Sequence, residues 1–216
     1  MPIWKDANWL LLDLETTDRE PDKAHPVEVG LVWMTCGNVV DTRRWLVKPP
    51  LPIPAETTAI HGISDADVED AQTIKEIGPE IIAAVEGADV LAGYNAYHYD
   101  FPIISRLAPG FRDACKTVTL LDPLVVVRLD NVGRWWKGKG RHRLMEAARR
   151  LGIEVDDEQA HGAVYDSEIA GRILGVVRDE LSDDGAEAQR YLVQQWRKQD
   201  ADFKAWLAKQ PPLEET

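Results

Sequence analysis

Residues Trp9 to Thr17 read Trp-Leu-Leu-Leu-Asp-Leu-Glu-Thr-Thr, an apolar run that ends in polar side chains. A run of this kind predicts a buried strand whose last residues reach an open edge of a sheet. Side chains alternate along a strand, so we expect Asp13 and Glu15 on the same face. Two neighbouring carboxylates in an apolar strand are costly unless a cation lies between them, and divalent cations prefer oxygen ligands. The segment alone leaves two readings open: part of a metal site, or a strand end where two acids reach water.

Size and composition limit the class of protein. The chain has 216 residues and two cysteines, which suits one domain or one domain with an appendage. It contains no apolar run long enough to cross a membrane, and its start lacks the layout of a secretory signal. Cys36 and Cys115 lack zinc-ligand spacing and are expected to be small buried residues in a reducing compartment. We therefore expect a cytoplasmic protein with no membrane partner.

The charge balance is acidic, with one local exception. A net charge of −12 argues against a general nucleic-acid coat protein, which would be basic. It does not exclude an enzyme that meets nucleic acid through bound metal and one basic patch. Seven cations against one acid, Glu146, form such a patch: Arg134, Lys137, Lys139, Arg141, Arg143, Arg149 and Arg150.

The order of elements predicts the fold class. Strand-like runs at 27–34 and 39–47, joined by a turn at 36–38, form an antiparallel meander with the first strand. Short strands at 89–93 and 118–121 then alternate with helices. This order implies an α/β fold in which helices flank a mixed sheet.

The end of the chain is expected to be a long helix. We divide the chain into a domain at 1–180 and a helical extension at 181–216. The helix carries an apolar stripe of Leu192, Trp196, Phe203, Trp206 and Leu207. Such a stripe covers the core by default, and a homodimer face or a docking face for a polymerase or other partner are the alternatives.

Two more acids are placed to join Asp13 and Glu15. Asp100 lies between a strand and a helix, near the end of the sheet where connecting loops gather ligands. Asp166 lies about one turn into the last core helix, and His161 lies just before it, where a helix amino terminus favours anions. Four carboxylates gathered with nothing between them would repel strongly, and two divalent ions would relieve that repulsion.

Three motifs together resemble those of the DnaQ-like (DEDDh) 3′–5′ exonucleases. They are Asp13-Leu14-Glu15-Thr16-Thr17, Tyr94-Asn95 through Asp100, and His161-Gly162-Ala163-Val164-Tyr165-Asp166, with His61-Gly62-Ile63 as a further landmark. They occur in family order, and the joint match is specific. The family usually has glycine where this chain has Asp18, but an aspartate can adopt turn geometry, so the loop is expected to survive.

The resemblance implies an RNase H-like fold: a mixed five-stranded sheet, with an antiparallel meander plus parallel strands, flanked by helices. It also implies two divalent cations, Mg²⁺ or Mn²⁺. The resemblance further implies that Asp13, Glu15 and Asp166 hold the metals directly. Asp100 would hold one of them directly or through water. His161 would be the general base. The chemistry agrees, because phosphodiester hydrolysis needs an activated water and charge relief on the leaving 3′-oxygen.

Substrate contacts are expected from two groups of residues. In the family, the pocket for the 3′-terminal nucleotide is lined at the positions of Thr16, Thr17, His61 and Asn95. Plain turn and capping chemistry is the alternative for the threonines and the asparagine. A glycine-flanked loop offers an aromatic and basic set for the strand: Trp135, Lys137, Lys139 and Arg141.

We therefore expect a metal-dependent 3′–5′ exonuclease that releases nucleoside monophosphates from single-stranded DNA in proofreading, repair or DNA turnover. An exoribonuclease of the same family is the first alternative. We favour DNA over RNA, but nothing in the sequence separates the two, because a 2′-OH contact depends on pocket detail. A catalytically silent nucleic-acid-binding module is the second. The presence of all four carboxylates and the histidine counts against it.

Overall fold

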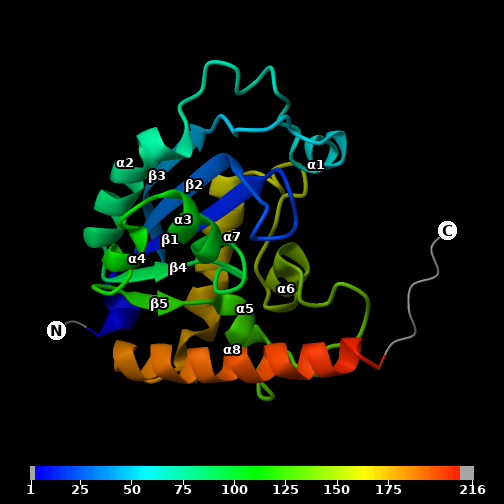
Figure 1. Cartoon of the computed structure of the whole chain (residues 1–216). Helices are drawn as coiled ribbons and strands as arrows, with labels where there is room; N and C mark the ends of the chain where they lie inside the picture. Colours follow the sequence, from blue (N-terminus) through cyan, green and yellow to red (C-terminus); the bar gives the residue numbers. More distant parts are fainter. Residues whose placement is uncertain (1–2, 210–216) are drawn as a thin grey trace.

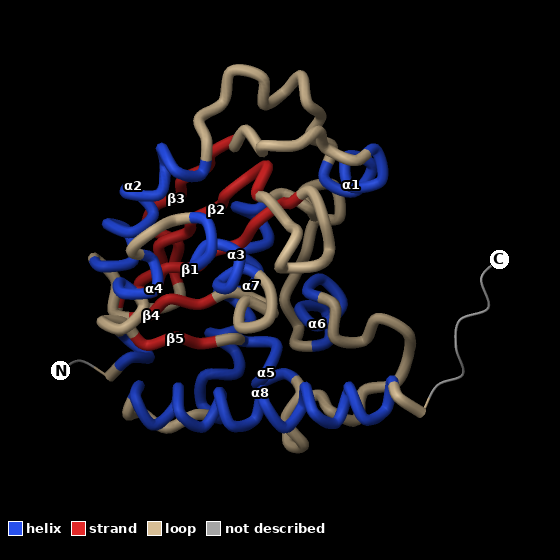
Figure 2. The backbone as a smooth tube through the Cα atoms, in the orientation of Figure 1, coloured by secondary structure: helices blue, strands red, loops and turns tan. Residues whose placement is uncertain are grey.

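The centre of the molecule is a five-stranded sheet, seen in a computed structural model that describes residues 3–209. The strand order is β3-β2-β1-β4-β5 (Figure 1, Figure 2). The first three strands form an antiparallel meander, β4 is parallel to β1, and β5 is parallel to β4. The strands are β1 (Asn8–Thr16), β2 (Pro26–Thr35), β3 (Asn38–Leu46), β4 (Val90–Ala92) and β5 (Thr119–Leu121). The predicted mixed sheet is confirmed.

Eight α-helices are described around this sheet. They are α1 (Ala55–His61), α2 (Ile74–Glu86), α3 (Asp100–Leu107), α4 (Phe111–Ala114), α5 (Pro123–Val127), α6 (Leu144–Arg150), α7 (Ala163–Val177) and α8 (Gly185–Leu207). The start of α2 illustrates why the boundaries follow the sequence: Thr73 and Glu76 form a reciprocal capping box. Across the described chain, no helix combines the length and apolar character that a membrane span requires.

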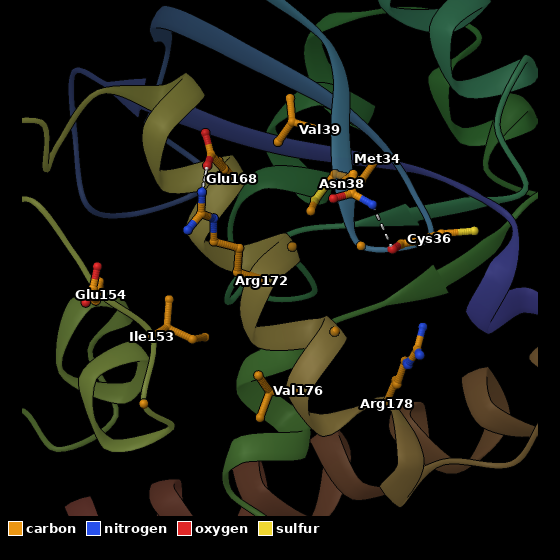
Figure 3. Close-up of a pocket in the computed structure, with 14 residues that line it drawn as sticks. Met34, Cys36, Asn38, Val39, Ile153, Glu154, Glu168, Arg172, Val176 and Arg178 are labelled. Carbon is orange, nitrogen blue, oxygen red and sulfur yellow. Dashed lines mark hydrogen bonds and ion pairs between the residues drawn. The ribbon is translucent and has the colours of Figure 1, made fainter.

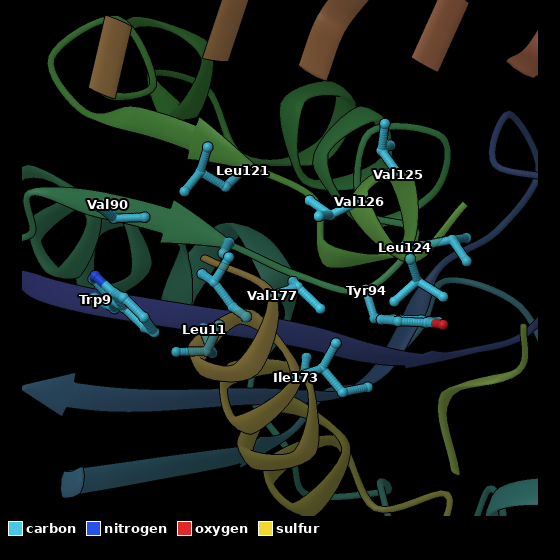
Figure 4. Close-up of a cluster of buried hydrophobic side chains, with 14 of the residues drawn as sticks. Trp9, Leu11, Val90, Tyr94, Leu121, Leu124, Val125, Val126, Ile173 and Val177 are labelled. Carbon is cyan, nitrogen blue, oxygen red and sulfur yellow. The ribbon is translucent and has the colours of Figure 1, made fainter. Parts of the chain in front are cut away.

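Alternation along β1 separates two cores. Trp9 and Leu11 face the core beneath α5, α7 and α8, which Figure 4 shows. The alternate residues Leu10, Leu12 and Leu14 face the core beneath α2, α3 and α4. Asp13 and Glu15 continue the row of Trp9 and Leu11. The two acids therefore lie on the side of the sheet that α7 covers.

Helix α7 lies unusually close to the sheet at two glycines. A Cβ at Gly30 would lie 2.3 Å from the backbone carbon of Ala163, and one at Gly171 would lie 2.3 Å from the Met34 sulfur. Only glycine fits at the backbone approach of Gly30, whereas a side chain at Gly171 would displace the Met34 side chain. Gly30 is the register partner of Asp13, so the first turn of α7 is brought next to the acidic end of β1.

Helix α8 covers the edge strand β5 with its N-terminal half. Gln189 Oε1 accepts a hydrogen bond from Leu120 N at 2.7 Å, and Leu192 is fully buried. This contact blocks an otherwise open sheet edge. The C-terminal half runs past the sheet and α5 (Figure 1), so its apolar side chains are exposed by 58%, 55% and 55%, respectively: Phe203, Trp206 and Leu207.

The expectation that the whole stripe covers the core is therefore wrong for those last three residues. The division of the chain at residue 180 and an interface role for the helix stay predictions. Residues 210–216 of the extension lie outside the described chain.

Cys36 corrects another expectation. The turn predicted between β2 and β3 is present, but Cys36 is exposed there, with φ of 50°, while Cys115 is partly buried. A residue at the tip of a hairpin has no core to enter, whatever its hydrophobicity.

Candidate active site

Four carboxylates from three elements converge at one end of the sheet. Asp13 and Glu15 lie near the end of β1, Asp100 is the first residue of α3, and Asp166 lies in the first turn of α7. The charges of the other three acids all raise the pKa of Asp13, which requires them to be close. The structure thus brings together the four acids that the sequence singles out, while their individual roles stay predictions.

Burial is the largest cause of an unusual protonation state at this site. It raises the pKa of Asp13 well above its ordinary value and the pKa of Glu15 to about 9, with the neighbouring carboxylates adding to both effects. Burial likewise raises the pKa of Asp100 to about 8 and that of Asp166 to about 7. Such a group of acids takes up either protons or cations.

The donor set fits a divalent cation. Ligand atoms of Glu15, His161 and Asp166 lie within 4.8 Å of one another. Asp166 Oδ1 is buried and has no hydrogen-bond partner among the described residues. A buried carboxylate oxygen without a partner is costly, and a hard cation that binds oxygen would satisfy it.

Two residues at the site adopt left-handed backbone conformations without being glycine. They are Asn95, with φ of 67°, and His161, with φ of 65°. Asparagine visits this region readily, whereas for most other residues it costs about 1–2 kcal/mol. The His161 backbone N–H also hydrogen-bonds the Asp166 carboxylate, which partly offsets the raised pKa of that acid. Backbone strain of this kind is typical of functional sites.

The hydroxyls of the two threonines hold the turn after β1. Thr16 Oγ1 donates to the Asp18 carbonyl at 2.9 Å, and Thr17 Oγ1 accepts from His25 N at 3.1 Å. The Tyr99 hydroxyl contacts both Thr16 Oγ1 and the Asp18 carbonyl. Asp18 itself keeps a φ outside the left-handed region, so the loop holds without the family's glycine.

His61 has one ring nitrogen engaged and one without a partner. Nδ1 accepts from Ile63 N at 3.1 Å, while Nε2 is buried and unpaired among the described residues. Burial lowers the pKa of His61. The Thr16 backbone and the charge of Glu28 oppose this effect in part, and the nearby charge of His161 adds to it. The two histidines therefore lie at the same site, although they are far apart in sequence.

The basic loop, residues 134–143, is not part of the acidic cluster. Trp135, Lys137 and Lys139 are exposed on it, and the Arg134 guanidinium lies 5.5 Å from the Trp135 ring centre. Arg141 instead lines a groove that also includes Asn95. The structure thus places only Arg141 of this set beside a residue of the second motif.

Glu28 on β2 is a residue of this site that our reading of the sequence missed. Its side chain is 1% exposed, its Oε2 accepts from Ala163 N at 2.8 Å, and it pairs with Arg44. Its charge raises the pKa of Glu15 and of Asp166. The sequence signal that could have identified Glu28 was its position between two valines in a strand predicted to be buried.

Asp122 was also missed, and it fixes the turn that leads to Asp100. The carboxylate is 1% exposed and accepts from the backbone N–H groups of Asn95 (2.9 Å), Tyr97 (3.2 Å) and Leu124 (3.0 Å). Burial raises the pKa of Asp122 to about 6, and these hydrogen bonds lower it in part. The position of Asp122 directly before Pro123 predicts a helix start. It does not predict that the carboxylate also binds the backbone of Asn95 and Tyr97.

A separate pocket of about 680 Å³ lies between the β2–β3 turn and α7 (Figure 3). Arg172 and Glu168 in it pair with each other at 2.5 Å. None of the residues that the sequence singles out for catalysis or substrate binding lines it. We therefore place the candidate active site at the carboxylates.

The strand order defines a DnaQ-like RNase H fold. The acids at the end of β1 are the residue types that a metal-dependent nuclease site needs. Comparison with known proteins agrees. The RNase_T family model, described as "Exonuclease", matches residues 10–174. The chain belongs to the RNase T/DnaQ-like exonuclease family.

Two relatives illustrate the range of the family. "Uncharacterized exonuclease CP81" of Escherichia phage 186 is 33% identical over 198 residues, which cover 85% of this chain and 92% of that protein. A PolC-type DNA polymerase III of Mycoplasma pneumoniae is 24% identical over 177 residues, which cover 82% of this chain. The chain spans only 12% of that polymerase's length.

Solved structures share the fold. Exonuclease X in complex with 5′ overhanging duplex DNA matches with a TM-score of 0.65 and 21% identity, covering 85% of this chain and 99% of that one. Escherichia coli exonuclease I in complex with a dT13 oligonucleotide matches with a TM-score of 0.67 and 18% identity, covering 80% and 41%.

Proposed function

We propose that this protein is a metal-dependent 3′–5′ exonuclease that releases nucleoside monophosphates from the 3′ end of single-stranded DNA, in proofreading, repair or DNA turnover. The observation that carries the proposal is the convergence of Asp13, Glu15, Asp100 and Asp166 with His161 beside them. Family membership supports the reaction class. The DNA bound to exonuclease X and exonuclease I supports DNA over RNA.

The acids suit two divalent cations, Mg²⁺ or Mn²⁺. Asp13, Glu15 and Asp166 would hold them directly, and Asp100 directly or through water. When bound, such ions supply water activation and charge stabilisation at the leaving oxygen. The unpaired Asp166 oxygen and the raised pKa values of the cluster are what this assignment explains.

We assign the role of general base to His161. Its side chain is exposed at the edge of the cluster, with a ring nitrogen within 4.8 Å of carboxylate oxygens of Glu15 and Asp166. As general base, it accepts a proton from the attacking water and releases it to solvent. A positioned base of this kind contributes about 10²–10⁴-fold to the rate.

The 3′-terminal nucleotide would be held by the residues around the turn after β1 and the second motif: Thr16, Thr17, His61 and Asn95. The unpaired His61 Nε2 is available to a ligand, while the threonine hydroxyls already serve the turn. The loop residues Trp135, Lys137, Lys139 and Arg141 would contact the strand beyond that nucleotide.

The test is a digestion of 5′-labelled single-stranded DNA and RNA with Mg²⁺, with Mn²⁺ or with EDTA. We expect a ladder that shortens from the 3′ end of DNA with metal, none with EDTA, and none from Asp13→Ala. If RNA is shortened faster than DNA, RNA is the preferred substrate. No ladder on either polymer would leave a binding module.

A further inference from the structure

A groove of about 690 Å³ lies between the basic loop and the exposed half of α8. Its walls come from the turn after β4, from α5 and the residues after it, from loop residues 134–143, and from α8 between Trp196 and Leu207. The loop and α8 are far apart in sequence, so the groove exists only in the folded chain. The acidic cluster does not line it, although Asn95 of the second motif does.

The groove carries an excess of positive charge. Five cationic side chains, from Arg and Lys, line it against three acids. The acids are already engaged: Asp122 accepts three backbone hydrogen bonds, Asp200 pairs with Lys204 at 2.7 Å, and Asp202 lies 4.0 Å from an Arg134 nitrogen.

Three arginines of the groove form no ion pair within the described residues: Arg128, Arg141 and Arg143. Burial lowers the pKa of Arg128, the charges of Tyr94 and Asp122 oppose this effect, and the nearby charge of Arg141 lowers the pKa further. Like charges held together in a protein of net charge −12 form a surface that favours a polyanion.

Aromatic rings line the opposite wall. Trp196 meets the ring of Tyr97 edge-on at 6.0 Å, which anchors α8 to the turn before Asp100. Further along, Phe203 is 58% exposed and stacks on Trp206 at 5.9 Å. Cationic side chains that face exposed aromatic rings are the combination that proteins use to bind unpaired nucleic-acid strands.

The groove is continuous with the turn that delivers Asp100. Asn95 and His98 of that turn line the groove, and the Tyr94 hydroxyl donates to the His142 carbonyl of the basic loop at 2.9 Å. A strand whose 3′ end lies at the carboxylates therefore has the groove directly beside it.

We propose that this groove binds the part of a single DNA strand that lies upstream of its 3′-terminal nucleotide. Phosphates contact Arg128, Arg141 and Arg143, and a base stacks on Phe203. The proposal rests on the proposed function, because it assumes that the 3′ end occupies the acidic site. It gives the exposed half of α8 a role in substrate retention.

Charge-reversal variants of matched net charge test the groove. The groove variant is Arg128→Glu with Arg143→Glu, and the control is Arg197→Glu with Lys198→Glu, two exposed α8 positions that do not line it. The affinity of each protein for a fluorescent oligothymidylate of about 20 nucleotides is measured by anisotropy across a salt series, with Ca²⁺ in place of Mg²⁺.

We expect the groove variant to bind at least about tenfold more weakly than the control, because its new carboxylates repel the phosphates that the arginines attract. The salt dependence of log K should become shallower by about 0.7 for each phosphate that the variant no longer neutralises. Phe203→Ala should weaken binding by about tenfold without changing that slope, because it removes stacking and no charge. Equal affinities and slopes for the groove and control variants would overturn the proposal.

A trinucleotide separates this proposal from the function on which it rests. The trinucleotide offers a 3′ end but no strand long enough to follow the groove. If wild-type protein cleaves the trinucleotide and binds the longer strand no more tightly than the trinucleotide, the proposed exonuclease function is supported and the groove proposal is overturned. If it cleaves neither substrate but the groove variant still loses affinity for the longer strand, the groove stands and the exonuclease function fails.

Discussion

The buried carboxylate of Glu28 on β2 accepts a hydrogen bond from the backbone N–H of Ala163, the first residue of α7, at 2.8 Å. Glu28 is also the register partner of Glu15, and two like charges directly opposite each other destabilise a strand pair. The helix amino terminus and Arg44 compensate the charge of Glu28. This carboxylate therefore ties the sheet to the helix that carries Asp166.

Replacing Glu28 tests that positioning role. Glu28→Ala leaves the Ala163 N–H buried without an acceptor, and we expect the free energy of unfolding to fall by about 2–3 kcal/mol. Cleavage should slow as well, because Asp166 and His161 flank the loosened helix start. Glu28→Gln keeps an acceptor oxygen of the same shape and should retain most of the stability and rate. Urea unfolding and digestion rates measure both, and identical behaviour of the two variants would contradict the role.

The variant Asp13→Asn distinguishes the effect of the acidic cluster on stability from its role in cleavage. Removing one of four mutually repelling carboxylates should raise, or at least not lower, the melting temperature without metal. Cleavage should fall by roughly a hundredfold or more, since charge stabilisation at the leaving group is lost. The melting temperature with and without Mn²⁺ is the second readout. A variant that melts below wild type in EDTA would contradict the electrostatic cost, from burial first and mutual repulsion second, that the raised pKa values indicate.

Local patterns were enough to predict the sheet and to single out the acids. The alternation along β1 put Asp13 and Glu15 on one face, and the structure places them on the α7 side of the sheet. Glu28 escaped attention because its partner, Ala163, lies 135 residues away in sequence. Only the fold brings the two together, and the close approach at Gly30 has the same origin.

Burial at the ends of elements was predicted less well. The sequence shows a uniformly apolar stripe on α8. The helix extends beyond the sheet that it covers, so Phe203 and Trp206 face solvent while Leu192 is buried. Cys36 was misjudged for a similar reason, since composition does not say that its turn projects from the sheet. How far an element extends beyond its neighbours is a property of the whole fold.

His161→Ala should act on the reaction rate and not on metal binding. We expect cleavage to fall by about 10²–10⁴-fold, the usual contribution of a general base, while Mn²⁺ still raises the melting temperature. Glu158→Ala, an exposed position in the same connecting segment, is the matched control and should cleave at the wild-type rate. Loss of the Mn²⁺ shift in His161→Ala would make this residue a metal ligand instead.

The metal-free protein should become less stable as the pH rises from about 7 to about 9. Carboxyl groups in an unfolded chain titrate near pH 4, whereas burial raises the pKa of Asp100 to about 8 and of Glu15 to about 9. The folded state therefore holds protons that the unfolded state has released, and the free energy of unfolding falls with pH through this window. Starting near pH 7 avoids His25, His61 and His142, whose lowered pKa values add stability with rising pH only below about 6.5.

Divalent cations should reverse this trend. They bind the ionised acids and compete with the protons, so the gain in melting temperature from Mg²⁺ over EDTA should grow between about pH 7 and about pH 9. Cys115, whose pKa burial raises to about 11, destabilises the folded state in the same direction at the alkaline end. That contribution is the same with and without Mg²⁺, so the difference between the two melting curves isolates the carboxylates. A difference that stays constant across this range would show that the four acids do not act together as the metal site.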